Sequence, residues 1–222
     1  MSVARPAQSL PTGDALRLAI FDCDGVLFDS WKANVAFYNT VLTACGRPTL
    51  DEETLHLCHT LSSPQLYAHL FPDDVPMQRR IAEIARATDY APFYGLMEPV
   101  AELEATLAHL SRHCPLALAT NRGTTVNGVL ERFGLEAYFP IRFGILDVAR
   151  PKPAPDMLLA CLERARVDAD AAVYVGDTEL DREAARAAGI AYIGVGPASG
   201  AELRITGIRE LPALLLDGLD QA

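Results

Sequence analysis

The chain has 222 residues, half of them hydrophobic, and its 19 basic and 29 acidic side chains give a formal charge of −10. This composition excludes a disordered or fibrous chain, and the length allows one large domain or a core domain plus a smaller one. The negative charge argues against nucleic-acid partners and an anionic membrane surface, because a negative protein repels polyanions. It would also repel an anionic substrate unless a local site reverses the field.

The five cysteines are odd in number and form no Cys-x-x-Cys pair. We therefore expect free thiols in a reducing cytosol rather than a disulfide framework or a zinc site. The apolar run nearest the N-terminus, LRLAIF, is too short for a signal-peptide core, and no run approaches the roughly 18 residues of a membrane span. These features predict a cytoplasmic protein without membrane association.

The first part of the chain predicts one strand followed by a helical insert. Residues 1–14 are expected to be a flexible lead-in, and LRLAIFDCD then predicts a buried strand that runs into acidic residues. Four helical patterns without a convincing strand follow: ANVAFYNTVLTACG, capped by Gly46; DEETLHLCHTL and SPQLYAHLF, opened by Asp51 and Ser63 as N-caps; and VPMQRRIAEIARATDY. We interpret residues 31–92 as a small all-helical domain.

Strands and helices alternate in the rest of the chain. The strand candidates are CPLALAT, IRFGIL, AAVYVGD and AYIGVG, with amphipathic helical patterns between them, the last short helix running from about Asp181 to Ala188. Alternation of this kind predicts an α/β fold with a parallel sheet covered by helices on both faces.

Two aspartates flank a cysteine at the end of the first predicted strand, in FDCDGVLFDS. Carboxylates two residues apart on extended backbone point to opposite faces, but Gly25 permits a sharp turn that brings Asp22 and Asp24 to one site. Two carboxylates there can bind a hard cation, and one can act as nucleophile while the other transfers protons. The structural alternative is an acidic turn in which an aspartate caps local backbone groups.

Two further strand ends carry groups that suit a phosphate. In LALATNRG, Thr120 and Asn121 precede a helix, where a hydroxyl and free N–H groups can bind phosphate, although an N-cap role also explains them. In RPKPAPD, Lys152 lies between two prolines, before a helix that starts near Pro155. The rigid backbone can direct this ammonium at a phosphate or a carboxylate, and a solvated lysine in a turn is the structural alternative.

The fourth segment, YVGDTELD, follows the clearest strand. Gly176 and Asp177 end that strand, and Asp181 lies four residues on. Thr178 as N-cap, with Glu179 and Asp181 offsetting the helix dipole, would satisfy local physics, but the carboxylates can also complete a metal shell. Because ligands of open α/β sheets bind at the carboxyl ends of the strands, the four segments are expected to meet.

In this order, DCDGVLFDS, ATN, KPAPD and GDTELD resemble the motifs of the haloacid dehalogenase-like phosphohydrolase superfamily. The resemblance runs from about residue 16 to residue 216, and the helical insert resembles the cap of the phosphoglycolate phosphatase and beta-phosphoglucomutase-like branch. It implies a Rossmann-like α/β core formed by residues 15–30 and 93–222, with a helical cap at 31–92.

The resemblance also implies roles for the acidic residues. Asp22 would be the nucleophile that forms an aspartyl-phosphate, and Asp24 would protonate the leaving oxygen and then activate water. Mg²⁺ would be held by the Asp22 carboxylate, the backbone carbonyl of Asp24 and Asp177. Asp181 would complete this metal site from its outer shell by steering Lys152 or a bound water.

The remaining site residues would neutralise the phosphoryl group. The resemblance assigns its oxygens to Thr120, the Asn121 backbone and Lys152. A carboxylate that attacks a phosphate dianion meets strong repulsion, so cations and N–H donors are needed there. Arg122 is a candidate for a further cation on the phosphate side, although a solvated helix arginine explains it as well.

The leading hypothesis is therefore a Mg²⁺-dependent phosphatase, monomer or homodimer, whose partner is a small phosphorylated metabolite. Asp24 favours phosphoryl transfer over dehalogenation, because true dehalogenases lack an acid at this position and need no metal. A phosphomutase on the same core is the alternative; it would return the phosphoryl group to the substrate and exclude water. A phosphorylatable regulatory module, which would be shorter and lack a cap, and a catalytically silent binding protein are more remote.

The cap departs from the family pattern in its substrate loop. Related caps often carry a glycine there, whereas no glycine occurs between Gly46 and Gly95. Phosphoglycolate specificity is therefore not carried over. The corresponding loop is CHTLSSPQ, and we expect surface or core roles for its polar residues and the histidine before it: His56, His59, Thr60, Ser62 and Gln65.

Overall fold

The computed structural model describes residues 9–216, apart from the side chains of His59 and Thr60. Residues 1–8 of the predicted lead-in lie outside this range. The chain divides into two compact units: a core unit, Met1–Phe28 with Pro99–Ala222, and a helical unit, Asp29–Glu98.

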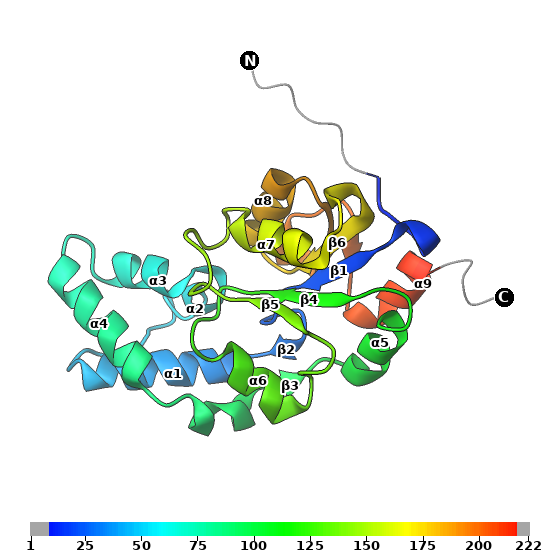
Figure 1. Ribbon diagram of the computed structural model, residues 1–222. Coiled ribbons are helices and arrows are strands. Elements are labelled where there is room, and N and C mark those ends of the chain that lie inside the picture. The colour runs from blue at the N-terminus through cyan, green and yellow to red at the C-terminus, as the bar shows by residue number, and fades with distance from the viewer. Residues whose placement is uncertain (1–8, 217–222) are drawn as a thin grey trace, which may run out of the picture. The chain divides into compact units, whose positions relative to one another are not determined.

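A six-stranded sheet forms the centre of the core unit (Figure 1). Its order is β5-β4-β1-β6-β7-β8, and each neighbouring pair is parallel. The inner strands are buried on both faces, which explains why they read as short unbroken apolar runs. The strands are β1 (Leu18–Phe21), β4 (Leu116–Ala119), β5 (Ile141–Phe143), β6 (Ala172–Gly176), β7 (Ala191–Val195) and β8 (Arg204–Ile205).

Helices cover both faces of this sheet, as the sequence predicts (Figure 1). Alternate strand residues such as Ile20 and Tyr174 pack with α7 (Asp156–Ala165) and α8 (Glu179–Ala188). On the opposite face, Phe21 contacts Phe139 with ring centroids 6.0 Å apart. That face carries α5 (Leu103–Leu110), α6 (Val126–Phe133) and α9 (Leu211–Leu216). Short 3-10 helices of this unit are η1 (Gly13–Ala15), η3 (Ala169–Ala171), η4 (Pro197–Ser199) and η5 (Ile208–Glu210).

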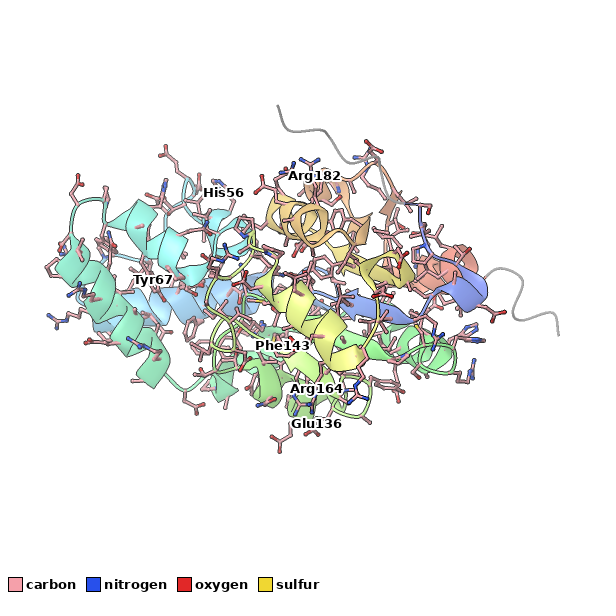
Figure 2. All side chains as sticks on the ribbon, turned by 45° about the horizontal axis from the view of Figure 1, so that its top comes forward. His56, Tyr67, Glu136, Phe143, Arg164 and Arg182 are labelled. Atoms are coloured by element: carbon pink, nitrogen blue, oxygen red, sulfur yellow. The ribbon has the colours of Figure 1, made fainter. Side chains whose placement is uncertain are left out.

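The helical unit has a core of its own. Its elements are α1 (Trp31–Ala44), α2 (Leu57–Thr60), α3 (Ser63–Leu70), α4 (Val75–Ala87) and the 3-10 helix η2 (Ala91–Leu96). Figure 2 labels Tyr67 on α3, and its ring is buried in a cluster that includes Val41, Leu66 and Ile81. Two short strands, β2 (Phe28–Asp29) and β3 (Glu98–Pro99), pair as a two-stranded sheet.

Two predicted helix starts in this unit are wrong, whereas the predicted cap at Gly46 is confirmed. Gly46 has a φ of +69° just beyond α1. The segment opened by Asp51 forms turns and its helix begins only at Leu57, although the Asp51 carboxylate accepts the N–H of Thr54 at 3.0 Å as an N-cap does. The N-cap of α3 is Ser62 rather than Ser63. Within residues 9–216, every helix is too short or too polar to span a membrane.

Candidate active site

The parallel strands β1, β4 and β6 place three of the predicted segments side by side. Phe21 of β1 lies opposite Val175 of β6, and the N–H of Asp22 donates to the Val175 carbonyl at 2.9 Å. The residues that follow the three strands are Asp22 after β1, Thr120 after β4 and Asp177 after β6. The topology therefore brings together side chains that are far apart in the sequence.

The loop after β1 turns sharply at Gly25, as predicted. Gly25 has a φ of +75°, in the left-handed region, and its N–H donates to the Phe28 carbonyl at 2.8 Å. A Cβ at this position would lie 1.9 Å from Asp177 Oδ2, so both the backbone and the approaching carboxylate require glycine. Cys23, one residue after Asp22, is fully buried, and burial raises the pKa of its thiol; a nucleophilic thiolate is therefore disfavoured.

Lys152 is buried between two carboxylates. Its Nζ lies 2.7 Å from Asp181 Oδ1 and 2.9 Å from Asp22 Oδ1. It also donates to the Tyr174 hydroxyl at 2.9 Å and to the Ala119 carbonyl at 3.2 Å. Burial lowers the pKa of Lys152, but the charges of Asp181 and Asp22 outweigh burial and raise this pKa above its usual value. A solvated lysine is therefore the wrong explanation for this position, because Lys152 is only 2% exposed.

Asp181 is fully buried in the first turn of α8, and both of its carboxylate oxygens accept hydrogen bonds. Oδ1 accepts from the Tyr174 hydroxyl at 2.7 Å as well as from Lys152, and Oδ2 accepts from the N–H and hydroxyl of Thr178 at 3.0 and 2.5 Å. Burial raises the pKa of Asp181, but Lys152 and these hydrogen bonds outweigh it and leave the pKa lowered. The predicted N-cap role of Thr178 is confirmed, and Asp181 reciprocates in a capping box.

Tyr174 is a site residue that the sequence analysis missed. Alternation along β6 predicts which face of the sheet it occupies, but not the groups that its hydroxyl reaches. In the structure the hydroxyl contacts Lys152 and Asp181 and lies 3.2 Å from the Ala119 carbonyl.

Asp22 and Asp177 each have a buried Oδ1 without a hydrogen-bond donor among the described residues. Lys152 approaches Asp22 Oδ1 as an ion pair, without the angles of a hydrogen bond. Burial, opposed by Lys152 and reinforced by Asp181 and Asp24, raises the pKa of Asp22 to about 7. Burial and the charge of Asp22 raise the pKa of Asp177 to about 8. Burial therefore disfavours the ionised form of both carboxylates more than Lys152 favours it.

The acidic groups fit a hard divalent cation. One carboxylate oxygen from each of Asp22, Asp177 and Asp181 lies within 4.8 Å of the others. Mg²⁺ prefers oxygen ligands of this kind, and the oxygens without donors belong to Asp22 and Asp177. Because hydrogen bonds already engage both oxygens of Asp181, this carboxylate suits a supporting position better than that of a ligand.

Thr120 and Asn121 do not cap the helix that follows them, so that expectation is wrong. The N-cap position of α6 is Thr125, and turn residues separate it from β4. Asn121 instead binds the Lys152 backbone, accepting its N–H at 3.1 Å and donating to its carbonyl at 3.3 Å. The Thr120 hydroxyl accepts the N–H of Arg122 at 3.2 Å. Asn121 therefore joins the second predicted segment to the third.

Arg122 is buried, which corrects its interpretation as a solvated helix arginine. Its exposed fraction is 7%, and it forms a bidentate ion pair with Asp24. Nε donates to Asp24 Oδ2 at 2.7 Å, and Nη2 donates to Oδ1 at 2.5 Å. Arg122, which follows Thr120 and Asn121 after β4, thus holds the Asp24 carboxylate in the loop after β1.

Two polar residues of the loop CHTLSSPQ have structural roles. The N–H of Ser62 donates to Gln65 Oε1 at 2.9 Å in the capping box of α3. His56, labelled in Figure 2, is exposed. The side chains of His59 and Thr60 lie outside the described part of the structure.

The chain is similar in sequence to a family of hydrolases and to proteins named as phosphatases. A family model described as "Haloacid dehalogenase-like hydrolase" matches residues 19–195. The chain is 30% identical over 190 residues to the probable phosphatase IndB of Dickeya dadantii, which covers 80% of each protein. It is also 30% identical over 231 residues to phosphoglycolate phosphatase 1 of Pseudomonas aeruginosa, which covers 99% of this chain and 82% of that protein.

A solved structure supports the same relationship. It is a hydrolase of the haloacid dehalogenase superfamily, subfamily IA, variant 1, from Geobacter sulfurreducens. The two chains are 35% identical, with a TM-score of 0.74, and the match covers 93% of this chain and 100% of the other.

Proposed function

Because the chain belongs to the haloacid dehalogenase-like hydrolase family, we propose that it is a Mg²⁺-dependent phosphatase acting on a small organic phosphate monoester. The observation that carries the proposal is the pair of buried carboxylate oxygens, Asp22 Oδ1 and Asp177 Oδ1, which lack hydrogen-bond donors beside the buried Lys152 ammonium. Such a site is short of positive charge and therefore favours the binding of a cation. A bound cation supplies the positive charge that phosphoryl transfer needs.

Asp22 is the proposed nucleophile and also a metal ligand. Mg²⁺ would be held by the carboxylates of Asp22 and Asp177 and the backbone carbonyl of Asp24, with Asp181 in support. When bound, the metal supplies positive charge that keeps Asp22 ionised and offsets the charge of the phosphoryl group. The Asp22 carboxylate attacks phosphorus, the bond to the leaving oxygen breaks, and an aspartyl-phosphate forms on Asp22.

Asp24 is the proposed group for both proton transfers. Its carboxyl group gives a proton to the departing alkoxide in the first step. It then takes a proton from the water that attacks the phosphorus of the aspartyl-phosphate, which releases inorganic phosphate and restores Asp22.

Lys152, Thr120 and Asn121 are the proposed phosphate-binding groups. The Lys152 ammonium is held within 2.9 Å of Asp22, where it can offset charge on the attacking carboxylate and on the phosphoryl oxygens. The Asn121 side chain supports the Lys152 backbone from both its N–H and its carbonyl. The Thr120 hydroxyl and the Asn121 backbone N–H would bind the remaining oxygens.

The proposed substrate class is a small phosphorylated metabolite. Relatives at about 30% identity include proteins named phosphoglycolate phosphatases, which makes 2-phosphoglycolate the first compound to assay. A panel of phosphorylated metabolites, scored by released phosphate, then tests other members of the class.

Turnover of p-nitrophenyl phosphate tests the mechanism. We expect activity with Mg²⁺, loss of activity with EDTA, recovery when Mg²⁺ is added back, and no activity for Asp22→Asn. Asp170→Asn, which changes an exposed aspartate, is the control and should retain activity. Activity that persists without metal or in Asp22→Asn would overturn the mechanism. Free phosphate should appear without a bisphosphate activator, because a mutase would need the activator and release little phosphate.

A further inference from the structure

Arg122 and Asp24 form a close ion pair at the end of β1 and β4. The guanidinium contacts both carboxylate oxygens, at 2.7 and 2.5 Å, and Arg122 is buried while the Asp24 side chain is 23% exposed. A planar guanidinium that binds a carboxylate through two parallel hydrogen bonds fixes the plane of that carboxylate as well as its position.

Other contacts hold Arg122 in place. Its N–H donates to Thr120 Oγ1 at 3.2 Å, its carbonyl accepts the N–H of Ile145 at 3.0 Å, and Nη1 donates to Thr125 Oγ1 at 3.3 Å. A Cβ on Gly144 would lie 2.7 Å from the Arg122 carbonyl, so the chain beyond β5 packs directly on this backbone. The position of the guanidinium is therefore fixed by contacts with residues other than Asp24.

Asp24 lies in a tight turn, which fixes its backbone but not the plane of its carboxylate. It precedes Gly25, whose φ is +75°, in the loop after β1. Proton transfer requires the carboxyl group to lie within hydrogen-bond reach of the leaving oxygen, and a misplacement of about 1 Å can cost a factor of 100 in rate.

We propose that Arg122 is a positioning residue, which orients the Asp24 carboxyl group so that it can give its proton to the leaving group. This inference rests on the proposed phosphatase function and on the acid–base role of Asp24 within it. It differs from the role of a phosphate-binding cation, because the Nε and Nη2 donors of Arg122 point at a carboxylate of the protein. A single ammonium at this position would keep the charge and lose the bidentate geometry.

The dependence of rate on the leaving group tests this role. Phenyl phosphate and p-nitrophenyl phosphate have similar shapes, but phenolate is a more basic leaving group than p-nitrophenolate. Departure of phenolate therefore depends more strongly on protonation by an acid. Because kcat/KM reports the steps up to departure of the leaving group, it isolates the transfer that Asp24 performs. Arg122→Lys should lower kcat/KM for phenyl phosphate by about 10- to 100-fold, and that for p-nitrophenyl phosphate by less than about threefold.

Arg182→Lys is the matched control. Arg182 forms a bidentate ion pair with Glu179 on the exposed side of α8 (Figure 2), so this variant removes the same kind of interaction away from Asp24. Both substrates should keep their wild-type kcat/KM. In an Asp24→Asn background, Arg122→Lys should add no further selectivity between the two esters, because a residue that acts through Asp24 has no effect once that carboxylate is gone.

An equal loss on both esters, or a rise in KM alone, would overturn the inference and favour a direct phosphate contact. Circular dichroism checks the fold; if Arg122→Lys does not fold, Thr125→Val removes the Nη1 contact and should show the same selectivity at smaller size. A kcat/KM that falls by the same factor for both esters in that variant would again count against the inference. If the wild-type protein turns over neither ester with Mg²⁺, the proposed function itself fails.

Discussion

Removal of the proposed nucleophile should stabilise the metal-free protein, and by more at high pH. Asp22 has a pKa of about 7 in the folded protein against an ordinary 3.8, so the folded state holds a proton that the unfolded state releases. Stability therefore falls as pH rises from about 4 to 7. Relative to a carboxyl group of ordinary pKa, Asp22 therefore lowers the free energy of unfolding by about 4 kcal/mol at pH 8 and by about 2 kcal/mol at pH 5.5.

Asp22→Asn keeps the shape of the side chain and removes this charge. Lys152 still has Asp181 as its partner at 2.7 Å, and Asp177 loses a repulsive neighbour. In urea denaturation with EDTA, the variant should unfold at higher urea than the wild type. Its advantage should grow by about 2 kcal/mol between pH 5.5 and pH 8, because the unfavourable ionisation in the wild type is larger at the higher pH.

Mg²⁺ and a control variant complete this test. Mg²⁺ should raise the stability of the wild type more than that of Asp22→Asn, because the variant has lost a proposed ligand. Asp170→Asn, at an exposed position, should change stability by less than about 0.5 kcal/mol at either pH. An advantage of Asp22→Asn that is the same at both pH values, or a loss of stability at pH 8, would refute the reasoning.

Three other substitutions probe the same network. Lys152→Met should abolish turnover and lower the free energy of unfolding by about 3–5 kcal/mol, measured by urea denaturation, because it leaves two buried carboxylates without their shared cation. Tyr174→Phe should lower kcat roughly tenfold with little change in KM, since it removes one of the hydrogen bonds that aim Lys152; an unchanged kcat would assign Tyr174 to packing alone. Gly25→Ala should abolish Mg²⁺-dependent turnover and lower the melting temperature, whereas Gly95→Ala, with open space around its Cβ, should do neither.

The fold could be predicted because its signals are local. Each central strand is a run of four or five residues buried on both faces, so it reads as an apolar segment without alternation. The turn after β1 is encoded by Gly25, which no residue with a side chain replaces easily. In the helical unit the prediction was weaker: the segment after Asp51 carries an N-cap hydrogen bond, yet it forms turns and its helix begins only at Leu57.

The partners within the site could not be predicted, because they come from distant segments. Arg122 and Asp24 are separated by 98 positions, and the pattern around Arg122 fits a solvated helix as well as a buried ion pair. Tyr174 is one of several apolar residues in its strand, and its contact with Lys152 depends on how the loop before α7 folds back. Motif order predicted which residues lie together at the candidate site, whereas their contacts depend on side-chain geometry.

The pattern of charge at the site explains how an acidic protein can act on an anionic substrate. Four carboxylates meet two cations, since Lys152 pairs with Asp22 and Asp181, and Arg122 pairs with Asp24. With all four carboxylates ionised, two negative charges would be in excess, and the raised pKa values of Asp22 and Asp177 show that these two residues ionise least readily without a further cation. The same two residues carry the buried oxygens without donors. One divalent cation would match both the size and the place of the excess, so a phosphate dianion would meet a neutralised site. Because this neutralisation is local, the formal charge of −10 still opposes long polyanions such as nucleic acids.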